Sequence, residues 1–123
     1  MHSRSTRGLC VAAARATGEV WSEKRRASLA GESSDATVDG PRPLVAIDAW
    51  MQEWAAQHDA NCERTRVAGS QPAAIMELRE RCLERQLRAV DHTLSRLEQD
   101  DWEPRARLDG LVSFAVQLPA LDE

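Results

Sequence analysis

The chain has 123 residues, which is room for one domain, and aromatic residues make up only 4% of it. Because β-branched residues are also few, the composition disfavours an all-β fold, and the net charge of −4 argues against nucleic acid or an anionic membrane as a partner of the whole chain. No apolar run reaches the roughly 20 residues of a membrane-spanning helix.

The first part of the chain is basic and the rest is acidic. Residues 1–31 carry six basic and two acidic side chains, whereas the remainder has a net charge of −8. We expect residues 1–30 to form a basic arm that is poorly ordered or weakly helical, with Trp21 and Leu29 as anchors on the main domain. The segment 31–43 is rich in Gly, Ser, Asp and Pro, which predicts a flexible linker. The arm lacks the apolar core of a secretory signal, so the cytoplasm is the default compartment.

Three helices are predicted after the linker, at about 44–66, 72–99 and 103–118. Apolar residues recur at three- and four-residue spacing in each, which is the pattern of one buried helical face. Ser70 is a candidate N-cap for the second helix. Joined by short polar turns, these helices predict an all-α fold, a small antiparallel three-helix bundle over residues 44–123. The apolar face expected for the second helix is Ile75, Leu78, Cys82, Leu83, Leu87, Val90, Leu94 and Leu97.

Motifs of catalysis and cofactor binding are missing from the sequence. It contains no GxxxxGK[ST], GxGxxG or GxSxG, and its one lysine, Lys24, lies in the basic arm. We therefore predict a protein that is not an enzyme, with no catalytic residues, no cofactor and no small-molecule substrate.

The three cysteines leave several interpretations open. Cys10, Cys62 and Cys82 are buried free thiols in a reducing compartment, or they form a disulfide in an oxidising one. A bridge between Cys62 and Cys82 is disfavoured by a height difference of about 9 Å along their helices, whereas Cys10 on its arm can reach Cys62. His58 lies four residues before Cys62, so a metal site with a further cysteine is a weak alternative, and no metal is expected.

Trp50 and Trp54 share one face of the helix 44–66. Packing in the core is the ordinary interpretation of such a pair. The alternative is an exposed anchor for a partner protein, because tryptophan is favoured at the centre of interfaces. We take the pair as the candidate interaction surface.

Two segments resemble a known family. Residues 62–71 read C-E-R-T-R-V-A-G-S-Q and residues 78–85 read L-R-E-R-C-L-E-R. They resemble the C-x-x-T-x-V-x-G-x-Q and L-R-x-x-C-L signatures of large bacterial serine/threonine protein kinases of the myxobacterial type. In that family the segment follows the kinase domain and a membrane-spanning helix and precedes a tetratricopeptide array. The resemblance covers residues 44–123, including the L-P-A-L end, and residues 10–29 more loosely.

The resemblance implies a connector module in bacterial signalling, with an unidentified protein partner and without kinase or repeat domains. It also implies that Cys82 is a free thiol here, because the family carries its partner cysteine just after L-P-x-L and this sequence has none. An extracytoplasmic location is a second expectation from the relatives. The alternatives are a redox- or metal-responsive thiol sensor built on the cysteines and His58, and a gene fragment without function.

Overall fold

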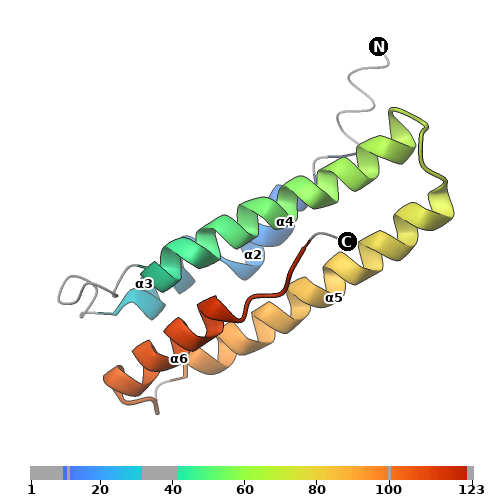
Figure 1. Cartoon of the computed structure of the whole chain (residues 1–123). Coiled ribbons are helices and arrows are strands. Elements are labelled where there is room, and N and C mark those ends of the chain that lie inside the picture. The colour runs from blue at the N-terminus through green and yellow to red at the C-terminus, as the bar shows by residue number, and fades with distance from the viewer. Residues whose placement is uncertain (1–9, 11, 32–41, 100, 122–123) are drawn as a thin grey trace.

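A computed structural model describes residues 10, 12–31, 42–99 and 101–121, and every regular element in this part of the chain is helical (Figure 1). The all-α prediction is therefore confirmed for the described residues. Most of the expected linker, residues 32–41, lies outside them. The helices are α2 (Ala13–Val20), α3 (Glu23–Ala30), α4 (Arg42–Arg66), α5 (Ala73–Leu97) and α6 (Pro104–Val116).

The long helices begin and end within two residues of their predicted bounds. Proline lies in the first turn of α4 and opens α6, where its missing N–H costs no helical hydrogen bond. The cap predicted for α5 is wrong. The residue before the helix is Pro72, in extended conformation, and the Ser70 hydroxyl lies 3.4 Å from the carbonyl oxygen of Arg64 in the preceding turn.

The described part of the N-terminal arm is helical. It forms α2 and α3, and both pack on the long helices through buried side chains, of which Ala13 is 0% and Leu29 is 3% exposed. Ser22 caps α3 by accepting a hydrogen bond from the Arg25 backbone N–H at 3.1 Å. Trp21 donates to Asp48 on α4. The arm therefore belongs to the folded unit, and Trp21 and Leu29 anchor it.

The helices surround α4, which contacts α2, α5 and α6. Figure 1 shows the chain turning back after α4, so that α5 lies alongside it, while α6 follows the first part of α4 and α2 lies behind α4. The apolar faces meet in one core, and Gly110 of α6 lets Leu97 approach closely, since a Cβ there would lie 3.0 Å from its side chain. The buried core residues are Ala13, Leu29, Leu44, Ile47, Trp50, Met51, Trp54, Leu83, Leu87, Val90, Leu94, Leu97 and Leu111.

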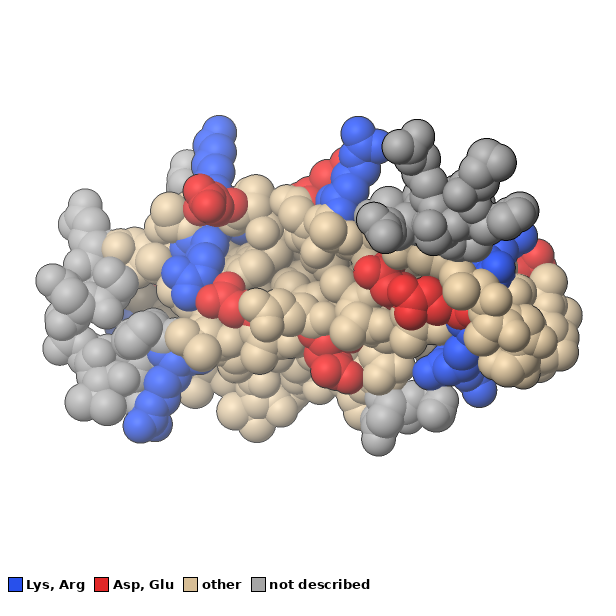
Figure 2. Space-filling view, turned by 90° about the horizontal axis from the view of Figure 1, so that it is seen from above, with Lys and Arg blue, Asp and Glu red and all other residues tan. Residues whose placement is uncertain are grey.

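The surface of the described region is mixed in charge. On the face drawn in Figure 2, basic and acidic side chains lie interspersed rather than gathered into a patch of one sign. None of the described helices is both long enough and apolar enough to cross a membrane.

Candidate functional site

Two of the cysteines are joined in the structure. Cys10 and Cys62 form a disulfide with a Cα–Cα separation of 5.6 Å, which ties the start of the arm to the last turns of α4. Cys82 is a free, exposed thiol on α5. The structure thus adopts the pairing that the sequence left open.

His58 packs inside the fold rather than in a ligand cluster. Its ring stacks on Trp54 with centroids 5.0 Å apart, and its Nε2 lies 3.4 Å from a carboxylate oxygen of Glu80. The sulfur of Cys62 is part of the disulfide and is no thiolate ligand. Among the described residues, no group of three or more His, Cys, Asp or Glu side chains is arranged to hold a metal ion.

The tryptophans taken as the candidate interaction surface lie in the interior. Trp50 is 7% and Trp54 is 1% exposed. Each indole N–H also has a partner: Trp50 donates to the carbonyl oxygen of Pro119 at 2.9 Å, and Trp54 donates to that of Leu83 at 2.7 Å. Because both rings are enclosed by packing and hydrogen bonds, the pair serves the core and cannot anchor a partner.

The signature residues of the α4–α5 turn have structural roles. Gln71 is buried and donates through Nε2 to the Asn61 side chain at 3.0 Å and to the Thr65 hydroxyl at 2.9 Å. Asn61, also buried, donates to the carbonyl oxygen of Met76. Gly69 has a positive φ of 68°, a conformation that glycine adopts at little cost. The buried amides of Asn61 and Gln71 therefore fix the turn.

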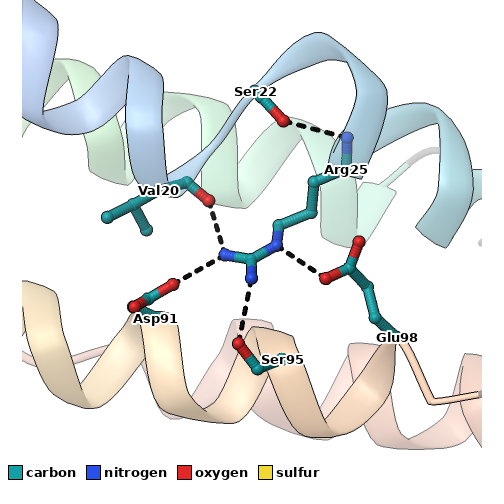
Figure 3. A network of polar contacts seen from close by, with 6 residues as sticks. All are labelled: Val20, Ser22, Arg25, Asp91, Ser95 and Glu98. Carbon is teal, nitrogen blue, oxygen red and sulfur yellow. Dashed lines mark hydrogen bonds and ion pairs between the residues drawn. The ribbon is translucent and has the colours of Figure 1, made fainter.

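An arginine clamps the arm to α5 (Figure 3). The Arg25 guanidinium donates to Asp91 at 2.8 Å, to Glu98 at 2.9 Å and to Ser95 at 2.9 Å, and it also reaches the Val20 carbonyl oxygen at 2.7 Å. Burial alone would lower the pKa of Arg25, but the hydrogen bonds to the two carboxylates outweigh it and raise the pKa. The Arg25 guanidinium is therefore charged at every ordinary pH.

A second ion pair joins the arm to α4. Arg26 contacts both carboxylate oxygens of Asp48, and the shortest distance is 2.7 Å. Trp21 donates to the same carboxylate at 2.6 Å. The hydrogen bond from Arg26 lowers the pKa of Asp48, burial acts against this shift, and the Trp21 bond supports it. Both ion pairs stabilise the packing of the arm on the long helices.

A groove of about 530 Å³ lies along α4, α5 and the C-terminal tail. The tail enters it where Gln86 donates from Nε2 to the carbonyl oxygen of Ala120. Two lining residues, Ile75 and Leu78, are 38% and 58% exposed, although apolar. The lining residues are Gln57, Asn61, Arg64, Ile75, Leu78, Arg79, Cys82, Leu83, Gln86, Ala120 and Leu121.

Helix lengths explain why the groove is open. The helices α4 and α5 have 25 residues each, whereas α6 has 13. At 1.5 Å per residue, α6 covers about 20 Å of a helix pair that is about 37 Å long. The uncovered part lies toward the α4–α5 turn, and the groove is found there.

Sequence reasoning placed Ile75, Leu78 and Cys82 on the buried face of their helix. In the structure all three are exposed and line the groove. The periodicity correctly marks an apolar stripe on α5, but a stripe does not reveal how far the neighbouring helices extend over it. This surface is the one that the sequence analysis missed.

Comparisons with protein-family models, with curated proteins and with solved structures each find no match for this chain.

Proposed function

We propose that the protein is a non-catalytic interaction module, in which α4, α5 and α6 form an antiparallel three-helix bundle and the groove binds a partner protein. The observation that supports it is the exposed apolar pair Ile75 and Leu78 beside the groove. Covering apolar surface stabilises a complex by about 25 cal/mol per Å² removed from water, before the costs of association. The resemblance to the kinase connector agrees with this role.

The lining chemistry supports binding over catalysis. Among the described lining residues there is a thiol, Cys82, but no His, Asp or Glu that could act on it as a base. The remaining polar groups are amides and two arginines, which recognise a partner but do not by themselves form a nucleophile–base pair.

Photo-cross-linking inside the cell of origin tests the function. A photoreactive phenylalanine derivative replaces Leu78 in the groove, and the same derivative replaces Val45 in a control. Val45 is a fair control because it is apolar, 55% exposed and lies 12 residues before Gln57, the first lining residue of the groove on α4. We expect a discrete protein adduct from the groove position and none from the control. The adduct should disappear when Cys82 is first alkylated with a bulky maleimide.

Absence of a groove adduct, or equal adducts from both positions, would contradict the proposal. Circular dichroism of both substituted proteins must match the unsubstituted chain for either result to count. An adduct that survives alkylation of Cys82 would place the contact outside the groove and would also contradict it.

We further propose an oxidising compartment for the module. The observation behind this is the Cys10–Cys62 disulfide, because disulfides persist outside the reducing cytoplasm. Alkylation during cell lysis, followed by mass spectrometry, tests it: one modified cysteine, Cys82, is the expected result. Three modified cysteines would overturn the assignment in favour of the reducing cytoplasm.

A further inference from the structure

We infer that the groove accepts an amphipathic helix of the partner, about ten residues long, whose acidic side chains meet Arg64 and Arg79. The inference rests on the proposed function and adds the shape and charge of the partner. Three features of the groove carry it: its length, its apolar wall and the sign of its charges.

The length argues for a helix. Where α6 ends, about 18 Å of the α4–α5 pair continues with no covering helix on this side among the described residues, and the tail lines its beginning at Ala120 and Leu121. A further helix lying there would pack on the same side of the α4–α5 pair as α6, next to the part of the pair that α6 covers. Docking of a helix into a groove between two others is a common mode of peptide recognition.

The wall argues for an apolar stripe on the partner. Ile75, Leu78 and Cys82 follow one another at spacings of three and four residues on α5, so they form a continuous ridge along the groove. Leu83 lies deeper and is 7% exposed, and Leu121 borders the ridge from the tail. A partner helix with apolar residues at positions i, i+3 or i+4, and i+7 matches that ridge.

The charges argue for carboxylates. Arg64 and Arg79 are the charged residues among the described lining, and both are exposed. Arg79 donates to Gln71 at 2.9 Å, which orients its guanidinium at the mouth of the groove. Two cationic groups at the turn end of the groove select against a basic side chain of the partner there and favour an acidic one.

A selection experiment tests this pattern without knowledge of the natural partner. A displayed library of random 16-residue helix-forming peptides is selected on the oxidised full chain, with the Leu78→Glu variant as counter-selection. We expect the enriched peptides to share an apolar i, i+3/i+4, i+7 stripe with Asp or Glu near one end. Fluorescence anisotropy of individual synthetic peptides then gives their affinities.

Charge variants sharpen the test. Arg64→Glu should weaken the acidic peptides about tenfold and should restore binding to versions in which Lys replaces the acidic residues. Arg88→Glu is the matched control, because Arg88 is exposed on α5 and does not line the groove. It makes the same charge change and should alter affinity less than twofold.

The outcomes separate the inference from the proposed function. Neutral apolar peptides that lose binding on Leu78→Glu, but not on Arg64→Glu, would leave the groove as a docking surface and overturn the acidic partner. Failure to enrich any peptide over Leu78→Glu would overturn the helix, while the cross-linking experiment judges the function independently. Binding of dodecanoate in the groove, with no peptide enriched, would replace the helix by a lipid-like carboxylate and would also overturn the inference.

Discussion

Arg25 is the single side chain with the most polar partners in the described arm. It is 16% exposed and reaches Asp91, Ser95 and Glu98 on α5 or just after it. Removal leaves the two carboxylates without their shared cation, and the loss of such partly buried charged bonds is costly.

We expect Arg25→Ala to lower the free energy of unfolding by about 2–3 kcal/mol. Arg25→Lys should recover little, since one ammonium cannot reproduce the fork of donors. Urea denaturation measures both variants, with Lys24→Ala as the control at a neighbouring exposed position. A loss in Arg25→Ala no larger than that of the control would show that the clamp does not stabilise the arm.

Asp48 makes the stability of the arm depend on pH. Its pKa is lowered in the folded state, so its contribution is present above the unfolded pKa of about 3.9 and is lost as pH falls through the lower folded value. Asp48→Asn should therefore cost about 1 kcal/mol at pH 7 and progressively less below about pH 4. Thermal melts across pH 2–7 measure this, and Asp109→Asn on the exposed face of α6 is the control. A constant difference at all pH values would contradict the assignment.

At the scale of the elements, the α4–α5 turn is fixed by buried amides and by one glycine. Gly69 has positive φ, whereas Gly18 lies within α2 and is not among the positive-φ glycines of the described chain. An added Cβ meets no atom within 4 Å at either position. The same substitution therefore isolates backbone conformation from packing.

We expect the two alanine substitutions to change the free energy of unfolding in opposite directions. Gly69→Ala should destabilise by about 1 kcal/mol because an L-residue is strained at positive φ. Gly18→Ala should stabilise by about 0.5–1 kcal/mol because alanine is the better helix former. Urea denaturation measures the free energy of unfolding of both variants. Changes in the same direction would contradict the explanation from backbone conformation.

Periodicity and helix-breaking residues were sufficient to predict the elements. Apolar spacing located α4, α5 and α6, and the prolines placed their beginnings within two residues. The same reasoning missed the ion pairs between the arm and the long helices, because Arg25 and Arg26 meet acids that lie far along the chain. Ion pairs at such sequence separations leave no local pattern.

At the scale of the whole molecule, the disulfide joins residues that are 52 positions apart. Closing a loop of that length stabilises the folded state by up to about 4 kcal/mol through the entropy of the unfolded chain. Reduction, or Cys10→Ser, should therefore lower the melting temperature markedly, whereas Cys82→Ser should leave it unchanged. Calorimetry with and without reductant measures the effect, and melts indifferent to reductant would contradict a bridge in the folded protein.

The groove shows what sequence could not supply at this scale. The apolar stripe of α5 was visible, yet its exposure at Ile75 and Leu78 depends on the shortness of α6 and on the path of the tail. Trp50 and Trp54 shared an equally conspicuous stripe and are enclosed. Which stripe remains uncovered is decided by the assembly of all the helices.

The disulfide also makes a covalent ring of the chain. It encloses α2, α3 and most of α4, and every peptide bond between Cys10 and Cys62 lies within that ring. A protease that cuts once between Ala30 and Arg42 would open the backbone without separating its parts. The nicked protein would keep the mass of the intact chain, plus one water, until a reductant divides it into two pieces.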